Sequence, residues 1–276
     1  MIEFKSISKS MIHTYNQFVR GDECGYVLKR KYIDRDWKSE WYDSPAMKLG
    51  KYFEAVLYNE LGFEEPIPEP DYLKSKVEKS KQAGYTPNPD DMMAGYSLAT
   101  KKAVNVASLM NQSGIKVTMV QRSVERSISA NRGGHGILDI DAEYKGRDVM
   151  IDIKYSGLID DKWADMGWAM YRAEQIEYHS IQALHYNMIT GKPFYYLVVN
   201  STNADIIKFI KMHITEQDQE MHINRVESIS QNMELLQEVD GFINYPNYGK
   251  CKACPVSDDC PDAQLILIPK IIETAL

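Results

Sequence analysis

The chain has 276 residues, of which 44% are hydrophobic and 26% are charged. This composition is that of an ordinary globular protein with room for a sizeable core, which excludes a disordered or fibrous chain. The formal net charge of −7 argues against broad electrostatic attraction to nucleic acid or to an anionic membrane. A nucleic-acid enzyme would therefore need a local basic surface.

Membrane insertion and secretion are not expected from the sequence. No apolar run approaches the roughly 18–20 residues of a transmembrane helix. The N-terminal stretch MIEFKSISKS lacks the apolar segment of a signal peptide. We therefore expect a cytoplasmic protein, in the cytoplasm of the host if a phage encodes it.

Hydrophobic periodicity predicts alternating helices and strands. Ser6 or Ser8 is expected to cap the first helix, and Ser44-Pro45 to open the second. Residues 62–95, rich in proline and charge, are interpreted as an exposed helical insertion. The predicted helices cover residues 6–20, 46–61, 91–111, 173–190 and 216–239, and the predicted strands cover residues 115–129, 194–200 and 205–213.

The stretch from Gly136 to Lys154 predicts a β-hairpin with one polar face. Lys145-Gly146 fits a two-residue turn between the arms. Alternation puts Ile137, Asp139, Asp141, Asp152 and Lys154 on one face, and Leu138, Ile140, Val149, Ile151 and Ile153 on the other. With that turn, Asp139 lies directly opposite Asp152, with Cβ atoms roughly 4.5–5.5 Å apart.

Two carboxylates at such a distance repel each other unless one is protonated or a cation neutralises them. A divalent metal is the natural resolution, and carboxylate oxygens favour Mg²⁺ or Mn²⁺ over Zn²⁺. Lys154 adds a positive donor at the same spot, which suits phosphodiester hydrolysis. The alternative is a solvated hairpin whose acids merely face outward. The convergence of Asp139, Asp152 and Lys154 within Ile- and Val-rich arms favours the site.

Two of the predicted helices carry further candidates. Glu54 lies near the edge of the apolar stripe of the second helix, where a carboxylate can reach a neighbouring metal or simply face solvent. In the helix that precedes the last two strands, Gln182 and Tyr186 are four residues apart and so share a face. His179 and His185 of that helix are interpreted as polar-face or capping residues.

The four cysteines are distributed unevenly. Cys24 lies near the start, whereas Cys251, Cys254 and Cys260 form a C-x2-C-x5-C pattern near the end. In a reducing compartment this arrangement favours metal ligands over disulfides. A 4Fe–4S cluster accepts a distant fourth thiolate, whereas structural zinc sites more often combine two C-x2-C knuckles, so we favour the cluster over zinc. The alternative is a set of free, buried cysteines.

Taken in order, these motifs resemble those of a known family. The sequence resembles the RecB-type branch of the PD-(D/E)XK nuclease superfamily. Within that branch it resembles the iron–sulfur members, namely the AddB subunit of helicase–nucleases and the CRISPR-associated RecB-like exonucleases. The resemblance spans roughly residues 8–261. It rests on Cys24, Gly50-x3-Glu54, Gly136-x2-Asp139, Asp152-x-Lys154, Gln182-x3-Tyr186 and the three C-terminal cysteines.

The resemblance implies an α/β fold in which helices flank a central mixed β-sheet. It implies a single nuclease domain over residues 1–276. Residues 244–261 together with Cys24 would form an iron–sulfur subdomain that links the N- and C-terminal segments.

The resemblance also implies roles for individual residues. Asp139, Asp152 and the backbone carbonyl of Ile153 would bind Mg²⁺ or Mn²⁺, and Lys154 would be the catalytic lysine. Glu54 stands where the family often has a histidine, and Asp152 replaces the commoner glutamate of the E-x-K form. The departure at Glu54 bears on the preferred metal and on the number of bound metals. Because aspartate is one methylene shorter than glutamate, Asp152 would have to sit on a slightly closer strand. Gln182 and Tyr186 would help hold the DNA strand and the lysine.

The implied activity is metal-dependent exonucleolytic cleavage of DNA at single-stranded ends. The setting would be recombination, repair or CRISPR adaptation, with DNA and proteins of such a complex as partners. Two alternatives remain open. One is a zinc- or iron–sulfur-stabilised endonuclease on duplex or branched DNA, and the other is a non-catalytic DNA-binding module.

Overall fold

The computed structural model describes residues 2–37, 44–69, 89–157, 173–202 and 205–242, together with Cys254 and Cys260. The chain divides into two compact units, each made of segments that are distant in the sequence. The first unit comprises Met1–Trp41, Ser127–Gly134 and Ile223–Leu276, and the second comprises Tyr42–Arg126 and His135–His222. The prediction of a single nuclease domain over residues 1–276 stays a prediction.

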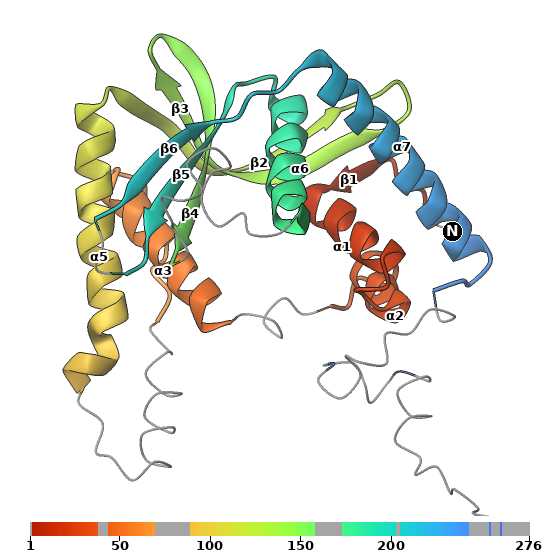
Figure 1. Cartoon of the computed structure of the whole chain (residues 1–276), viewed down its shortest axis with the longest axis horizontal. Helices are drawn as coiled ribbons and strands as arrows, with labels where there is room; N and C mark the ends of the chain where they lie inside the picture. The colour runs from red at the N-terminus through yellow and green to blue at the C-terminus, as the bar shows by residue number, and fades with distance from the viewer. Residues whose placement is uncertain are drawn as a thin grey trace, which may run out of the picture. The chain divides into compact units, whose positions relative to one another are not determined.

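The described helices of the N-terminal part precede most strands of the sheet, as Figure 1 shows in colour from the N-terminus. The elements are β1 (Ser6–Ser8), α1 (Lys9–Val19), α2 (Gly25–Lys29), the π-helix η1 (Arg30–Asp34), α3 (Pro45–Glu60), α5 (Pro89–Gln112), β2 (Ile115–Ser127), β3 (Gly133–Tyr144), β4 (Arg147–Ser156), α6 (Ala173–Thr190), β5 (Phe194–Asn200), β6 (Ile207–Lys211) and α7 (Glu216–Glu238).

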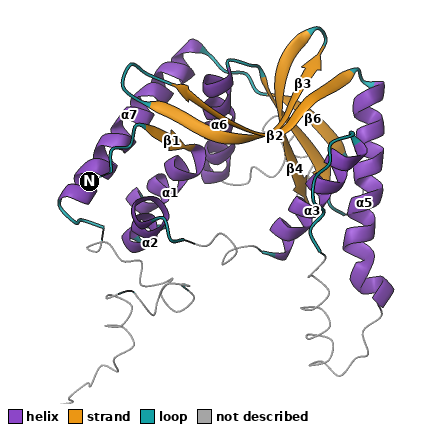
Figure 2. Ribbon diagram, turned by 180° about the vertical axis from the view of Figure 1, so that it is seen from behind, coloured by secondary structure: helices purple, strands orange, loops and turns teal. Residues whose placement is uncertain are grey.

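The second unit is built on a mixed β-sheet with strand order β3-β4-β5-β6, and β2 pairs with β3 (Figure 2). β3 and β4 are antiparallel, β4 and β5 are parallel, and β5 and β6 are antiparallel. The parallel pair needs a long crossover connection, and α6 lies in that connection. The predicted α/β class with a central mixed sheet is confirmed.

β5 is the most apolar strand because it lies inside the sheet, between β4 and β6. Its sequence, FYYLVVN, does not alternate, and six of its seven residues are buried. A strand that is covered on both faces has no polar side to present to solvent. The predicted strand over residues 194–200 therefore matches β5 from end to end.

Helices cover both faces of this sheet. α3 and α5 lie side by side, and their apolar residues, such as Phe53 and Val106, pack against Ile140 and Ile151 (Figures 1 and 2). α6 packs on the other face, where Ala183 joins a second cluster of buried side chains. Among the described helices, none has both the length and the apolar character needed to cross a bilayer.

The starts of two helices follow from their capping serines. Ser44 accepts a hydrogen bond from the backbone nitrogen of Met47 at 3.2 Å, and a proline follows at the first helical position. Ser8 caps α1 by accepting from the backbone nitrogen of Met11 at 3.2 Å. Both predicted caps are confirmed: Ser44 caps α3, and Ser8 rather than Ser6 caps α1.

The residues before Ser8 do not continue the first helix, which corrects the predicted range of 6–20. They form the short strand β1, whose Ile7 is fully buried. The backbone nitrogen of Gly133, at the start of β3, donates to the carbonyl oxygen of Lys5 at 2.6 Å. This long-range pairing outweighs the local helical pattern.

The predicted insertion over residues 62–95 is described only in part. Residues 70–88 lie outside the described residues. Residues 89–95 belong to α5, so the helix that follows the proline-rich stretch begins earlier than the predicted residue 91.

An ion pair fixes α7 to the N-terminal segment within the first unit. The guanidinium group of Arg132 donates to both carboxylate oxygens of Glu234, at 2.8 and 2.9 Å. The same carboxylate accepts from the backbone nitrogen of Phe4 at 2.9 Å. Such two-pronged pairs are geometrically specific, so they hold three distant segments of the chain in register.

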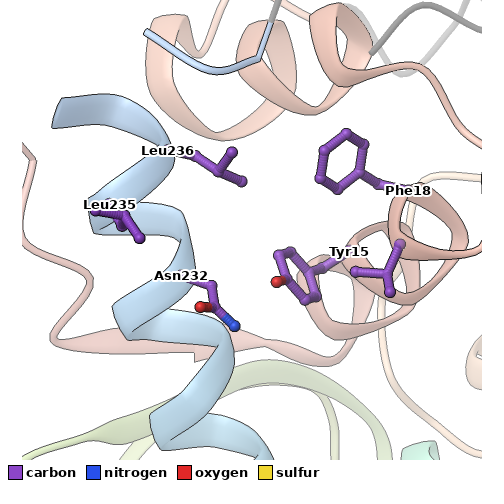
Figure 3. Close-up of a pocket in the computed structure, with 6 residues that line it drawn as sticks. Tyr15, Phe18, Asn232, Leu235 and Leu236 are labelled. Carbon is purple, nitrogen blue, oxygen red and sulfur yellow. The ribbon is translucent and has the colours of Figure 1, made fainter. Parts of the chain in front are cut away.

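A pocket of about 280 Å³ lies between α1 and α7 in the first unit (Figure 3). Tyr15 and Phe18 of α1 face Asn232 and Leu236 of α7 across it. Burial raises the pKa of the Tyr15 hydroxyl, and its hydrogen bond with Asn232 partly offsets that rise. The pocket is therefore mainly apolar, with one polar pair at its wall.

The Gly25→Ala substitution should destabilise the protein by about 1–3 kcal/mol, because an added Cβ forces the packed chain apart. That Cβ would lie 2.0 Å from the carbonyl oxygen of Phe242. Gly50→Ala is the matched control, because no atom lies within 4 Å of its added Cβ. In the interior of α3, alanine should stabilise by about 0.5–1 kcal/mol. Urea unfolding of both variants tests this, and equal stabilities would contradict the close approach at Gly25.

Candidate active site

The candidate site begins with the hairpin that joins β3 to β4. Lys145 and Gly146 both have left-handed backbone conformations, with φ of 52° and 72°. Two such residues in a row are the signature of a type I′ turn, whose twist matches that of the strands. The strands pair from Tyr144 with Arg147 to Ile140 with Ile151. The predicted turn and the register that follows from it are confirmed over these pairs.

The regular hydrogen-bonding pattern between β3 and β4 ends before Asp139. The backbone nitrogen of Ile153 donates to Oδ2 of Asp139 at 2.9 Å, so a carboxylate takes a place that a backbone carbonyl would fill in a regular ladder. Leu138 packs with Met150, whereas Ile140 packs with Ile153 in the other cluster. The predicted alternation, which put Leu138 and Ile140 on one face, is wrong here because β3 leaves the regular ladder.

Asp152 is the buried centre of the site, with a residue exposure of only 1%. Nζ of Lys154 lies 2.5 Å from its Oδ2, and Nε2 of Gln182 donates to its Oδ1 at 2.5 Å. The carboxylate is thus held by a cation on its own strand and an amide on α6. A buried charge requires such partners, since desolvation alone would expel or neutralise it.

Two further carboxylates, Glu54 and Asp139, lie close enough to Asp152 for strong repulsion. Burial raises the pKa of Glu54 to about 7, and the charge of Asp152 adds to the rise. Burial, Asp152 and Glu54 raise the pKa of Asp139 well above its usual value, against the hydrogen bond from Ile153. The sequence-based expectation that one acid of a close pair loses its charge is met by these shifts.

Lys154 supplies the compensating positive charge. Burial by itself lowers the pKa of its ammonium group, but the carboxylates of Asp152 and Asp139 outweigh burial, so the net shift is upward. The ammonium also lies over the ring of Tyr196, 5.6 Å from its centroid. The pKa of Lys154 therefore favours its charged form, in which the ammonium pairs with Asp152.

α6 presents a stripe of polar side chains to the acids. Gln182 and Tyr186, predicted to share a face, both interact with the site: Gln182 bonds Asp152, and Asp152 together with burial raises the pKa of the Tyr186 hydroxyl. Gly136 makes room for Tyr186, because a Cβ on Gly136 would lie 2.5 Å from Cε1 of the tyrosine ring. The presence of glycine in the Gly136-x2-Asp139 motif is thus explained by the space that the tyrosine ring occupies.

Besides Tyr196, which lies under Lys154, sequence analysis missed two further tyrosines of the site. Tyr178 lies one turn before Gln182, and its hydroxyl contributes to the raised pKa values of Lys154 and Tyr186. Tyr58 lies one turn after Glu54, and it is buried. The four-residue spacing was the available signal, because side chains one turn apart share a helix face.

Asp141, two residues after Asp139 on β3, is paired with two cations instead of lying among other acids. Its carboxylate pairs with Nε of Arg122 at 2.5 Å and with Nζ of Lys192 at 2.6 Å. Burial by itself raises its pKa, but the hydrogen bonds from these two cations outweigh burial, and the net pKa is lowered. Asp141 is therefore a permanently ionised structural residue.

The cysteines belong to the first unit, and three of them are described. Cys24 and Cys254 pack together with Val27 and Trp37 in one small cluster, and Cys260 is buried. No disulfide joins these three cysteines. Cys251 lies outside the described residues. The structure thus brings Cys24 to one cysteine of the C-terminal pattern, and the shared iron–sulfur site stays a prediction.

The acidic side chains that the structure describes do not form a ready-made metal site. Within the described part of the chain, no group of three or more His, Cys, Asp or Glu side chains is arranged so that it could hold a metal ion. The acids at Glu54, Asp139 and Asp152 repel one another but do not yet converge. Their oxygen donors nevertheless fit a hard divalent cation in chemical type.

A scan against protein-family models gives no match, and no curated protein matches the sequence. Among solved structures, a protein from Eubacterium rectale provisionally named an exonuclease is 15% identical, with a TM-score of 0.52 over 99% of this chain and 91% of that chain. The complex of LHK-Exo with dAMP is also 15% identical, with a TM-score of 0.32 over 74% of this chain and 99% of that chain. The first likeness establishes a shared fold.

The Glu54→Gln substitution should flatten the pH dependence of stability. The folded protein holds a proton on Glu54 up to pH of about 7, whereas the unfolded chain releases it above its ordinary value of 4.5. This contribution to stability is therefore complete below pH 4.5 and is lost as the pH rises through 7. The loss should be about 1–3 kcal/mol.

Urea unfolding without divalent metal, at about pH 5 and about pH 8, measures the effect. The control is Glu60→Gln, which changes an exposed glutamate at the end of the same helix. If Glu54→Gln retains the full pH dependence of the original protein, the pKa of Glu54 is not raised in the folded state.

Proposed function

We propose that this chain is a metal-dependent nuclease that hydrolyses phosphodiester bonds in DNA. The observation that carries the proposal is the buried carboxylate of Asp152, held between Lys154 and Gln182 and repelled by Asp139 and Glu54. A set of acids with one lysine is suited to bind a divalent cation and a phosphate together. The name of the Eubacterium rectale neighbour agrees with this reading.

Asp139, Asp152, Glu54 and the backbone carbonyl of Ile153 would hold Mg²⁺ or Mn²⁺. When bound, the ion would polarise the phosphoryl oxygen and lower the pKa of a bound water. The raised pKa values of Glu54 and Asp139 support this role, because a dication favours the ionised form of both. Their side chains would have to turn inward, since they do not converge without it.

The remaining residues would orient the reactants. Lys154 would stabilise negative charge on the scissile phosphate or orient the attacking water, and its raised pKa favours the charged form that this role needs. Gln182 fixes Asp152 through its amide, and it accepts a hydrogen bond from the hydroxyl of Tyr196 at 3.5 Å. Tyr186 would contact the DNA strand beside the lysine.

The preferred substrate in this proposal is a single-stranded DNA end, cleaved exonucleolytically during recombination, repair or CRISPR adaptation. Proteins of such a complex would be its partners. A zinc- or iron–sulfur-stabilised endonuclease acting on duplex or branched DNA is the nearest rival. A non-catalytic DNA-binding module is the other candidate, and the lack of a converged metal-binding group within the described residues favours it.

Cys24, Cys251, Cys254 and Cys260 would hold a 4Fe–4S cluster with a structural role. The packing of Cys24 with Cys254 supports it, because these residues are distant in the sequence. A cluster there would tie the N-terminal segment to the C-terminal loop, and it would close a loop of most of the chain.

Replacing Lys154 by methionine, or Asp152 by asparagine, should reduce Mn²⁺-dependent cleavage roughly 10²–10³-fold, because the first removes the cation that faces the phosphate and the second removes a charged metal ligand. The assay uses end-labelled linear single-stranded DNA and the same sequence as a circle. An exonuclease cleaves only the linear form. The control is Asp148→Asn, an exposed acid on the same strand.

Cleavage that is unchanged in both Lys154 and Asp152 variants would remove these residues from the mechanism. Cleavage of the circle would favour the endonuclease. Specific binding of DNA without any metal-dependent cleavage would favour the non-catalytic module.

Anaerobic purification should yield a brown protein with about four iron atoms per chain and absorption near 400 nm, as expected for a 4Fe–4S cluster. Cys24→Ser should lower the iron content and destabilise the fold, since the distant ligand closes the loop. A colourless protein with stoichiometric zinc would replace the cluster by a zinc site. A protein without either metal would leave the cysteines as buried side chains.

A further inference from the structure

Gln121 interrupts the regular backbone of β2. It has φ of 47°, in the left-handed region that non-glycine residues seldom adopt within a strand. The side chain is exposed, yet its amide nitrogen Nε2 donates to the hydroxyl oxygen of Tyr58 at 3.0 Å. Conformations of this kind persist where surrounding structure holds them, and they gather at functional sites.

Tyr58 belongs to the side of α3 that carries Glu54, one helical turn away. It is only 2% exposed, and it packs in the same cluster as Ile140 and Ile153. These two residues adjoin Asp139 and Asp152 in the strands. A tyrosine so deeply buried normally finds a hydrogen-bond partner for its hydroxyl group.

In its hydrogen bond with Gln121 the Tyr58 hydroxyl is the acceptor, so its own proton is available for a second hydrogen bond. Gln121 is the donor in their bond, because an amide nitrogen has no acceptor lone pair, so the tyrosine oxygen accepts. A tyrosine hydroxyl retains one proton to donate. Tyr58 lies one helical turn from Glu54 and packs with Ile140, the neighbour of Asp139, and the charges of both acids add to the rise in its pKa that burial causes.

We propose that Tyr58, held by Gln121, is a positioning residue that directs its hydroxyl proton toward Asp139 and Glu54 and orients these carboxylates for a divalent cation. The inference rests on the proposed function, in which those acids are metal ligands. Partners of this kind behind metal ligands fix the ligand orientation and tune affinity for the ion.

A tyrosine on the same helix provides a matched comparison. The hydroxyl group of Tyr52 bonds with Oγ1 of Thr100 at 3.1 Å, on α5 and away from the acids. Tyr52→Phe and Tyr58→Phe each remove one hydrogen-bonded hydroxyl from α3. The two variants therefore share the structural loss, and only Tyr58→Phe alters the acid cluster.

The test titrates Mn²⁺ into the full chain, with free Mn²⁺ followed by electron paramagnetic resonance. Tyr58→Phe should weaken Mn²⁺ binding roughly 10–100-fold, and Tyr52→Phe should change it less than about twofold. The Mn²⁺ concentration for half-maximal cleavage of single-stranded DNA should rise by the same factor. The maximal rate at saturating Mn²⁺ should change by less than about threefold, because the hydroxyl orients the ligands and does not touch the phosphate.

Gln121→Asn is a second variant for the same test if Tyr58→Phe does not fold. Asparagine adopts the left-handed conformation readily, but it is one methylene too short to reach Tyr58. Its Mn²⁺ binding should weaken in the same direction and by a smaller factor.

The outcomes separate the two proposals. Equal Mn²⁺ binding in Tyr58→Phe and Tyr52→Phe, in a protein that cleaves DNA, overturns the role of Tyr58 and leaves the nuclease assignment standing. Tight Mn²⁺ binding without cleavage overturns the nuclease assignment, and the comparison of variants still decides the role of Tyr58. Absence of Mn²⁺ binding by the unmodified protein overturns both.

Discussion

The mutual repulsion of buried carboxylates is the constraint around which the second unit is arranged. Asp152 is almost fully buried; burial and the charge of Asp152 raise the pKa of both Asp139 and Glu54, and Glu54 adds to the rise at Asp139. Such a group would destabilise the fold unless cations and hydrogen-bond donors compensate it. Lys154 and Gln182 provide that compensation in the absence of metal.

The scaffold explains how three acids from different segments meet. The hairpin turn sets the register of β3 against β4, the buried strand β5 fixes β4 from its other side, and α3 packs against β4 and brings Glu54 near Asp152. Each of these elements is held by apolar packing that leaves the acids little freedom to separate. The apolar core therefore stabilises a polar site that could not form alone.

Neighbouring positions on one strand show that residue type does not decide the chemistry. Asp141 and Asp139 are two residues apart in β3, and both are aspartates. Arg122 and Lys192 lower the pKa of Asp141, whereas burial among other acids raises that of Asp139. The cations that make the difference come from β2 and from the residues before β5, so the contrast is tertiary in origin.

Local chemistry in the sequence determined several features by itself. The Lys145-Gly146 turn, the caps at Ser8 and Ser44, the apolar run of β5 and the shared face of Gln182 and Tyr186 depend on residues within a few positions of one another. The register from Tyr144 with Arg147 to Ile140 with Ile151 also followed, because a two-residue turn leaves one register, whereas β3 departs from it at Asp139.

The tertiary structure decided what depends on distant partners. It turned Ser6–Ser8 into a strand by pairing it near Gly133, and it put Leu138 on the other face from Ile140. His185, expected on a polar face, is fully buried and hydrogen-bonded to His222 at 3.1 Å between ring nitrogens. Burial and long-range hydrogen bonds have no local signature, since they arise only when separate segments pack together.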